Sequence, residues 1–170
     1  MPWVYSRNHS QVDWSCRYLG IMDIKGLFTK WDVNLDLPGD DPSQWKLSAT
    51  IDATSMESAF GNRDETFRGP EWLDTEHYPT ITFEGKRIER TNGDYRVTGD
   101  VTIKGVTKPV TMDMKYQGEA TDRRGARRRI VTTEVVLPRS DFNVGPPREA
   151  GDAVGQDITI HLQIEGVWQE

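Results

Sequence analysis

The sequence predicts an all-β fold: an eight-stranded antiparallel barrel with an apolar lumen and one short helical lid. Apolar and polar residues alternate along most of the chain, which is the period of strands with one buried face. The alternation stops once, between Ile51 and Phe83, where helix signals replace it. Strands of this kind need a two-sheet sandwich or a closed barrel, and the long runs and the single lid favour the barrel.

The first part of the chain is predicted to supply four strand segments. Residues 12–18 alternate, residues 24–28 form a second run, and residues 31–37 continue it in the opposite parity. The slip near Thr29-Lys30 predicts a β-bulge, which bends a strand as a barrel requires. After a turn rich in Pro, Gly and Asp, residues 45–53 alternate again.

The interruption at 51–83 is predicted to be an amphipathic lid. Residues 54–57 and 62–65 both have capping-box spacing, and Gly69-Pro70 stops a helix. Gly61 makes two short helices as compatible with the pattern as one. In a single helix the residues that share the apolar face are Met56, Ala59, Phe60 and Phe67, with Arg63 and Asp64 beside them.

The charges on that face need partners, because a buried charge is costly unless it is paired. Two explanations stay open for Arg63 and Asp64. Either they pair with groups on the barrel and fix the lid, or they meet a polar ligand head group. Arg139, in the run Arg139-Ser140-Asp141-Phe142, is a candidate partner in both cases.

The second half of the chain returns to strands. A strand begins at Pro79, Gly85 permits a slip in register before Ile88, and Asn92-Gly93 predicts a tight hairpin into the next strand. Two further alternating runs lie at 95–103 and 110–116. The chain thus continues as an antiparallel meander.

The last strands flank a basic loop. Residues 118–129 carry five arginines and form either a solvated hairpin tip or a patch for an anion or partner. A strand at 130–137 follows, then an irregular connection marked by Gly145, two prolines and Gly151. Residues 158–164 alternate to the end and complete eight or nine strands.

Composition limits the class of protein. The 170 residues suit one domain, taken as 1–170, and the net charge of −6 with a pI near 5.1 argues against general nucleic-acid binding. No apolar run approaches a membrane span, and the N-terminus lacks a secretory signal pattern. The expected location is therefore cytoplasmic, or extracytoplasmic if the chain is a processed form.

The sequence offers no catalytic constellation. The three histidines, His9, His77 and His161, lie in separate segments without ligand spacing, and no nucleophile, phosphate-loop or dinucleotide motif occurs. The single cysteine, Cys16, is in phase with an apolar strand face and is predicted to be a small buried residue. We therefore expect no enzyme activity, no metal site and no cofactor.

The predicted lumen follows from the inward parity of the strands and the lid. Small residues such as Gly26, Ala49, Ala53 and Gly99 leave room there for one ligand. The residues predicted to line the lumen and lid are Trp14, Phe28, Leu47, Ile51, Phe60, Phe67, Leu73, Ile81, Phe83, Val97, Val101, Met112, Met114, Phe142 and Ile160.

A series of short motifs carries a family resemblance along nearly the whole chain. They are His9-Ser10, Gly26-x-Phe28, Ile51-Asp52-Ala53-x-Ser55, Asn62-Arg63-Asp64, Tyr78-Pro79-x-Ile81-x-Phe83, residues 99–110 and Arg139-Ser140-Asp141-Phe142. Each is weak alone, but in this order they are highly specific. The chain resembles the YceI-like polyisoprenoid-binding family.

The resemblance implies a lipocalin-like barrel, often dimeric, that holds a long amphipathic lipid. It implies non-catalytic binding, storage or transport of a polyprenyl or isoprenoid-quinone type of ligand, with His9, Arg63, Asp64 and Arg139 as head-group or lid anchors. Phe67 and Trp72 are bulkier than the family pattern and would narrow the cavity. The alternative is a protein-interaction or stress-related module with a filled barrel.

Overall fold

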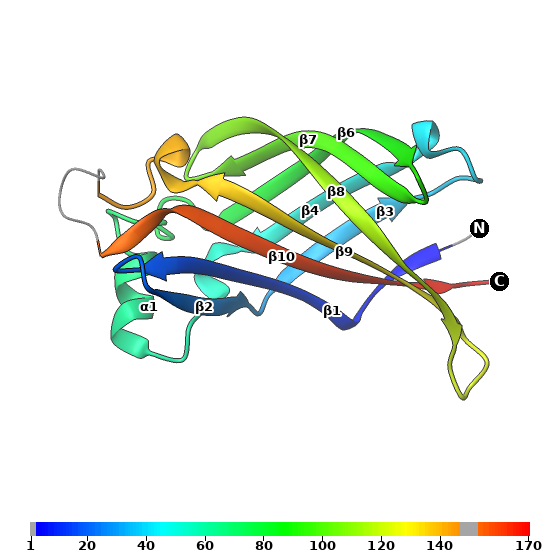
Figure 1. The fold of residues 1–170 in the computed structure, drawn as a ribbon, viewed down its shortest axis with the longest axis horizontal. Helices are drawn as coiled ribbons and strands as arrows, with labels where there is room; N and C mark the ends of the chain where they lie inside the picture. The colour runs from blue at the N-terminus through cyan, green and yellow to red at the C-terminus, as the bar shows by residue number, and fades with distance from the viewer. Residues whose placement is uncertain (1–2, 147–152) are drawn as a thin grey trace.

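The computed structural model describes residues 3–146 and 153–170, and these ranges form one strongly curled antiparallel sheet (Figure 1). The strands are β1 (Trp3–Tyr18), β2 (Met22–Phe28), β3 (Trp31–Asp36), β4 (Lys46–Asp52), β5 (Met56–Glu57), β6 (Thr80–Thr91), β7 (Asp94–Ile103), β8 (Val106–Thr121), β9 (Arg127–Pro138) and β10 (Val154–Trp168). Their order across the sheet is β3-β4-β6-β7-β8-β9-β10-β1-β2-β5. The all-β prediction is confirmed.

The eight-stranded closed barrel is not what the described residues form. They contain ten strands, and the ladder of hydrogen bonds ends at β3 and β5, so the sheet is a curled half-barrel. The slip at Thr29-Lys30 explains part of the difference, because it separates β2 from β3 instead of forming a bulge within one strand. β2 pairs with β1 and β5, whereas β3 pairs with β4.

The helical interruption is shorter than the sequence predicts. The single α-helix of the described ranges, α1, spans Gly61–Arg68. Both predicted caps are wrong, because Thr54 lies inside a 3-10 turn and Asn62 lies inside α1, whose N-cap is Phe60. The Asp52 carboxylate accepts a hydrogen bond of 2.9 Å from the Thr54 main-chain N–H and caps a 3-10 turn, η2 (Ala53–Ser55). The chain then enters β5, which adds to the sheet edge. Local side-chain capping and strand pairing thus replace the first half of the expected helix.

Two layers of apolar side chains fill the concave face of the sheet. One buried cluster, including Trp14, Phe28 and Phe142, lies beneath α1 and the 3-10 turn η3 (Arg139–Phe142). The other, including Val97 and Met114, lies toward the end where both termini emerge (Figure 1). We call these the lid end and the termini end.

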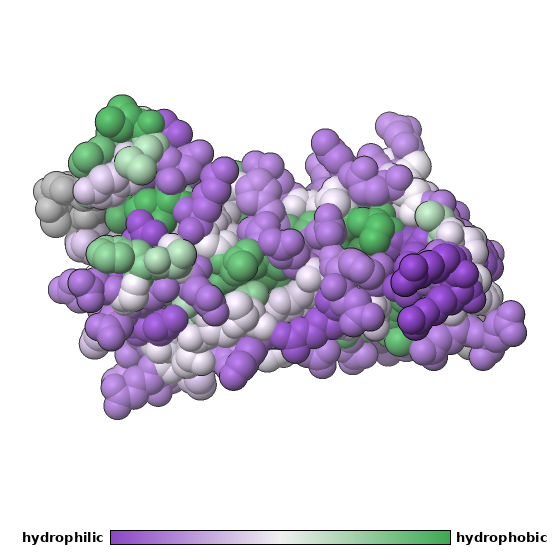
Figure 2. Space-filling view, turned by 90° about the horizontal axis from the view of Figure 1, so that it is seen from below, coloured by the Kyte–Doolittle hydropathy of each residue, from purple (hydrophilic) through white to green (hydrophobic). Residues whose placement is uncertain are grey.

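The surface differs between the two ends. Figure 2 shows apolar colour at the lid end, where the tip of the β1–β2 hairpin exposes Leu19, Ile21 and Met22. The most hydrophilic colour gathers at the opposite end, where Figure 1 places the β8–β9 hairpin with its arginines. Within the described ranges, no helix is long and apolar enough to cross a bilayer.

Two glycines, one in β6 and one in β7, lie opposite each other where these strands pack closely against neighbouring groups. Gly85 pairs with Gly99, and the register slips by one residue between Gly85 and Arg87, as the sequence predicts. A Cβ atom on Gly99 would lie 2.3 Å from the Glu84 carbonyl oxygen and 2.6 Å from Cζ of Phe83. Because Gly99 has no side chain, the Phe83 ring has room to pack in the interior.

The substitution Gly99→Ala tests this packing. Because the added methyl group would overlap a backbone carbonyl and a buried ring, we expect a loss of about 1–3 kcal/mol in the free energy of unfolding. Chemical denaturation measures it. The control is Gly61→Ala at the start of α1, where an added Cβ meets nothing within 4 Å; equal stability of the two variants would contradict the packing role.

Candidate ligand cavity

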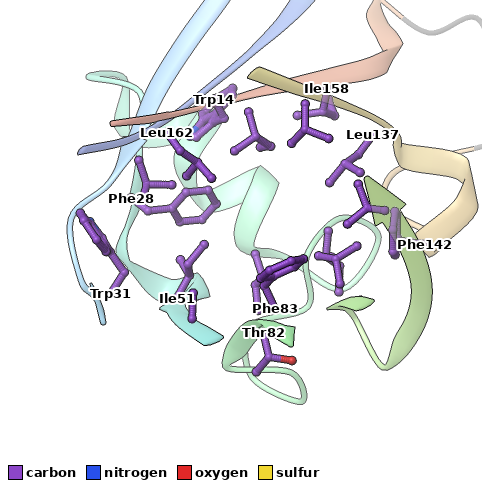
Figure 3. A pocket seen from close by; sticks show the side chains of 18 of the residues that line it. Trp14, Phe28, Trp31, Ile51, Thr82, Phe83, Leu137, Phe142, Ile158 and Leu162 are labelled. Atoms are coloured by element: carbon purple, nitrogen blue, oxygen red, sulfur yellow. The ribbon is translucent and has the colours of Figure 1, made fainter. Parts of the chain in front are cut away.

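An apolar cavity lies inside the curl at the lid end (Figure 3). Its volume is about 190 Å³. Of the residues predicted from sequence, those that line this lid cavity are Trp14, Phe28, Leu47, Ile51, Phe67, Leu73, Ile81, Phe83, Val101, Met112, Met114, Phe142 and Ile160. They come from seven strands, α1, η3 and the loop after α1, so strand parity brings distant segments together.

The sequence analysis left out several residues of the lid cavity wall. Trp31, Leu137, Ile158 and Leu162 all line it, and Figure 3 shows them around the same space as Phe83. Ile158 and Leu162 share the parity of Ile160, so the alternation in that strand was the signal that could have found them. Trp31 follows the break between β2 and β3, where parity alone did not fix its direction.

Two of the predicted lumen residues lie elsewhere. Val97 is buried but lines a second cavity toward the termini end. Phe60 is 55% exposed and is absent from both cavity walls, so its lumen assignment is wrong. The reason is that Phe60 precedes α1 with an extended φ of −138° and therefore does not share a helical face with Phe67.

Three rings close the lid cavity beneath α1. Phe67 packs against Trp72 with ring centroids 4.7 Å apart and against Trp14 at 5.9 Å. The Trp14 contact is edge-to-face, which aromatic pairs favour. Phe67 and Trp72, the large residues that the sequence places at the lid, thus form the inner surface of the lid.

Arg63 and Asp64 fix the entrance to α1. Asp64 is buried, and its carboxylate accepts hydrogen bonds from the main-chain N–H of Ser58, at 3.0 Å, and from the Ser58 hydroxyl. The Arg63 guanidinium donates to the Ser58 hydroxyl at 2.8 Å and to its carbonyl oxygen at 2.9 Å. Neither charged residue lines the lid cavity. This geometry favours lid fixing over contact with a head group, but the partner is Ser58, in the segment just before α1, rather than a group on the barrel.

Arg139 forms a second tie at the lid end. It is 2% exposed, and its guanidinium donates to the carbonyl oxygens of Gly155 at 3.0 Å and Val154 at 3.1 Å. It also donates to the carbonyls of Val144 and Pro146 and lies 5.0 Å above the Trp72 ring. Although Arg139 touches the cavity wall, these donors hold the chain after η3 against β10.

His9 lies away from both cavities. Its Nδ1 atom is 2.9 Å from Oε2 of Glu165, whose other oxygen is 3.0 Å from the Arg128 guanidinium. Glu165 is 2% exposed. The imidazole of His9, the guanidinium of Arg128 and the Ser10 hydroxyl, which accepts from the Glu165 main-chain N–H at 2.9 Å, surround this residue. His9 is therefore part of an ion-pair network between β1, β9 and β10.

A second cavity of about 200 Å³ lies at the termini end, and we call it the termini cavity. Leu47, Met114 and Ile164 border both cavities and form a partition between them. The termini cavity is rich in aromatic rings and includes Arg90 and Arg129 in its wall. From sequence, Arg129 was expected in the basic loop, as part of a solvated tip or of a patch for an anion or partner, and Arg90 was not assigned to a site. Their place in one wall depends on the order of strands in the sheet.

The described residues contain no group of three or more His, Cys, Asp or Glu side chains that could hold a metal ion.

The one cysteine of the chain is not placed to act as a nucleophile. Cys16 is buried in the wall of the lid cavity, and this burial raises the pKa of its thiol to about 11. At neutral pH it is therefore a thiol rather than a nucleophilic thiolate.

Sequence comparison identifies relatives over almost the entire chain. A family model described as YceI-like domain matches residues 3–166. Protein YceI of Escherichia coli O17:K52:H18 is 31% identical over 162 residues, which cover 95% of this chain and 83% of that protein.

Solved structures share the fold. BcnA of Burkholderia cenocepacia superposes with a TM-score of 0.85 at 22% identity, covering 95% of this chain and 99% of that one. A structure described as a polyisoprenoid binding domain from Saccharophagus degradans, implicated in plant cell wall breakdown, superposes with a TM-score of 0.72 at 12% identity. It covers 96% of this chain and 97% of its own.

The role of Asp64 in fixing α1 can be tested with Asp64→Ala. The change leaves the buried N–H and hydroxyl of Ser58 without their acceptor, so we expect local opening of α1 to become easier by about 2 kcal/mol. Hydrogen exchange of the α1 amides measures this opening. Glu65→Ala, at an exposed position in the same helix, is the control, and equal exchange in both variants would rule out the anchor.

The buried Cys16 gives a second test. Because its pKa is raised to about 11, we expect a thiol-specific disulfide reagent at pH 8 to label the folded protein far more slowly than the unfolded chain. Absorbance of the released thiolate follows the reaction. Rapid labelling of the fully folded protein would contradict this burial.

Proposed function

The chain belongs to the YceI-like family, and from this premise we propose that it binds an amphipathic lipid of the isoprenoid type inside its curled sheet without catalysing a reaction. The observation that carries the proposal is the lid cavity, whose wall is almost entirely apolar. The description of the Saccharophagus degradans domain as polyisoprenoid binding points to the same class of ligand. Storage or transport is the role we assign to such binding.

The chemistry of the lid cavity suits a hydrocarbon tail. Thr82, a polar residue of the wall, points away from the space in Figure 3, and the guanidinium of Arg139 donates to main-chain carbonyls. An apolar tail transferred into this wall leaves water without stranding a polar group. A charged or strongly hydrated ligand would lose its water and gain few hydrogen bonds in return.

The volume of each cavity limits the length of lipid tail that it can hold. An apolar cavity of roughly 150 Å³ already accepts a benzene-sized molecule. The lid cavity, at about 190 Å³, therefore accommodates part of a polyprenyl chain, and a longer tail would need the termini cavity as well. At about 0.3 kcal/mol per heavy atom, a tail of roughly twenty carbons contributes about 6 kcal/mol of binding free energy.

The alternative of a protein-interaction module relied on the arginine loop. Arg127 and Arg129 both bind Glu119, with Nε–O distances of 2.7 and 2.8 Å. Arg128 binds Asp122 and Glu165. Because these charges are compensated within the chain, they supply less attraction for a partner than the sequence suggests, and the lipid proposal is favoured.

Direct analysis of the bound molecule tests the proposal. Purified protein is examined by native mass spectrometry, and its organic extract by lipid mass spectrometry. We expect an isoprenoid lipid in stoichiometric amount, or binding of added polyprenol by the lipid-free protein. If no lipid co-purifies and the lipid-free protein does not bind added polyprenol, the proposal is overturned. The homodimer and the cytoplasmic location remain proposals, which light scattering and cell fractionation would test.

The lid rings give a sharper prediction. Phe67→Ala enlarges the lid cavity between Trp14 and Trp72, so we expect the bound lipids to shift toward longer or bulkier tails. Lipid mass spectrometry compares the profile with that of Phe60→Ala, in which the lost ring lies outside the cavity. The Phe60→Ala profile should match the parent, and an unchanged Phe67→Ala profile would show that these rings do not select the tail.

A further inference from the structure

The turn between β1 and β2 carries a group of exposed apolar side chains. Leu19 is 59% exposed, Ile21 78% and Met22 53%, and Ile21 is the most exposed large apolar residue in the part of the chain that the structure describes. We call residues 19–22 the hairpin tip. Figure 2 shows apolar colour at this end of the molecule. A group of apolar side chains left in water, unlike a single one, marks a surface that another molecule covers.

The backbone of the hairpin tip is unusual for an apolar residue. Leu19 has a φ of +55° and Gly20 a φ of +72°. Glycine and asparagine tolerate this left-handed region, whereas a leucine there has a conformational cost. The geometry of the turn therefore gives no reason for a leucine at this position, and the reason must lie in what the side chain meets.

Main-chain groups of the hairpin tip already have hydrogen-bond partners. The Leu19 N–H donates to the Ala153 carbonyl at 2.6 Å, and the Ile21 N–H donates to the Tyr18 carbonyl at 3.2 Å. A segment that enters an apolar phase must keep its polar main-chain groups hydrogen-bonded, because no water is present to replace the partners. These two donors would stay paired if the hairpin tip entered such a phase.

The charged residues that flank the hairpin tip compensate one another. The Arg17 guanidinium donates to the Asp23 carboxylate at 3.0 Å and to the Gly20 carbonyl at 3.0 Å. Residues 19–22 themselves carry no charge. The hairpin tip is thus an apolar projection with a neutral ion pair at its base. This combination offers little attraction to a charged partner and suits insertion between lipids, whose head groups can meet the ion pair.

The hairpin tip lies directly beyond the wall of the lid cavity. Cys16 and Val154 line that cavity, and Val154 pairs with Tyr18, the residue that precedes the tip. The Tyr18 side chain packs against the buried cluster beneath α1. Figure 1 shows the β1–β2 hairpin at the same end of the molecule as α1. A surface that receives the hairpin tip therefore also faces the end of the curl that holds the lid cavity.

We propose that the hairpin tip inserts into the surface of a lipid bilayer and docks the protein there while its ligand passes between the bilayer and the lid cavity. This inference rests on the proposed function, because a lipid with a long apolar tail leaves water for a membrane. The attraction comes from burial of the aliphatic side chains. Docking therefore needs no net charge on the bilayer and is insensitive to salt.

Vesicle flotation tests the docking. The sample is the lipid-free protein, and the probe is a vesicle of phosphatidylcholine, which has no net charge. We expect the protein to float with these vesicles equally at low and high salt. Failure to bind phosphatidylcholine would overturn the docking. Binding that requires added phosphatidylglycerol and is lost at high salt would overturn it as well, because charge would then supply the attraction.

Matched variants locate the contact. We expect Leu19→Asn and Ile21→Ser each to weaken vesicle binding by roughly tenfold. Asparagine tolerates the left-handed φ of Leu19, so Leu19→Asn should be at least as stable as the parent. Val4→Ser removes an aliphatic side chain that is 41% exposed at the termini end, and it should leave binding unchanged. Equal binding by all three variants would overturn the hairpin tip as the docking site.

Ligand uptake separates this inference from the proposed function. Polyprenol is supplied either from phosphatidylcholine vesicles or from dilute ethanol solution. Because Ile21 does not line the lid cavity, Ile21→Ser should bind as much polyprenol from solution as the parent but take it up from vesicles roughly tenfold more slowly. Equal rates from vesicles would overturn the inference. A parent that docks through the tip but binds no polyprenol from either source would reject the proposed function and keep the docking.

A second copy of the chain is the competing occupant of the hairpin tip. Light scattering of the parent and of Ile21→Ser distinguishes it from a bilayer. We expect the same oligomeric state for both proteins. A parent dimer that Ile21→Ser converts to monomers, with vesicle binding unchanged, would assign the hairpin tip to a contact between copies and overturn the docking.

Discussion

The interior exists because one antiparallel sheet bends far enough for its apolar face to meet itself. Two features make that bend possible. Gly99 lets the Phe83 ring lie against the β6–β7 pair, since any side chain there would collide with the Glu84 carbonyl. The break at Thr29-Lys30 sends β3 to β4 while β2 remains beside β1. A flat sheet with the same residues would expose its apolar face to water, so both cavities depend on the curl.

The two ends of the curl use their charged residues in the same way. At the lid end, Asp64 and Arg139 are buried and bind neighbouring chain segments, so their charges stabilise the structure that covers the cavity. At the termini end, Arg90 donates to the Asp40 carbonyl at 2.9 Å and Arg129 donates to Glu119 at 2.8 Å, and both guanidinium groups lie against aromatic rings. The charged groups at both ends thus hold chain segments together, which leaves apolar and aromatic side chains to define the interior.

The residues that could be predicted from sequence are those governed by local periodicity. Trp14, Phe83 and Met112 lie in long alternating strands, and all three line the lid cavity as predicted. Phe60 was assigned by extending a helix through positions that the structure uses for β5 and a loop. There the Asp52 carboxylate accepts from the Thr54 main-chain N–H, and the Asp64 carboxylate accepts from the Ser58 main-chain N–H. Tertiary pairing with β2 outweighed the local helix signals there.

The termini cavity could not be foreseen because its residues meet only through strand order. Trp3 and Arg129 are distant in the chain, and β10 lies between their strands. No spacing in the sequence reports such a contact. Parity describes which face a residue occupies, but it says nothing about which residue of another strand lies opposite. A cavity assembled from residues of eight strands is therefore visible only in three dimensions.

The pairing of β1 with β10 also bears on how the protein folds. Strands β6 to β10 follow one another in the sheet as they do in the sequence, so each pairs with its predecessor in the chain. β1 must instead find a partner at the far end of the chain, where Trp3 lies opposite Trp168. Closing so long a loop carries a large entropic cost and slows folding. The interior is complete only when this most distant pair has met, so the entropy of closing one long loop is part of the free-energy cost of forming a sheltered volume.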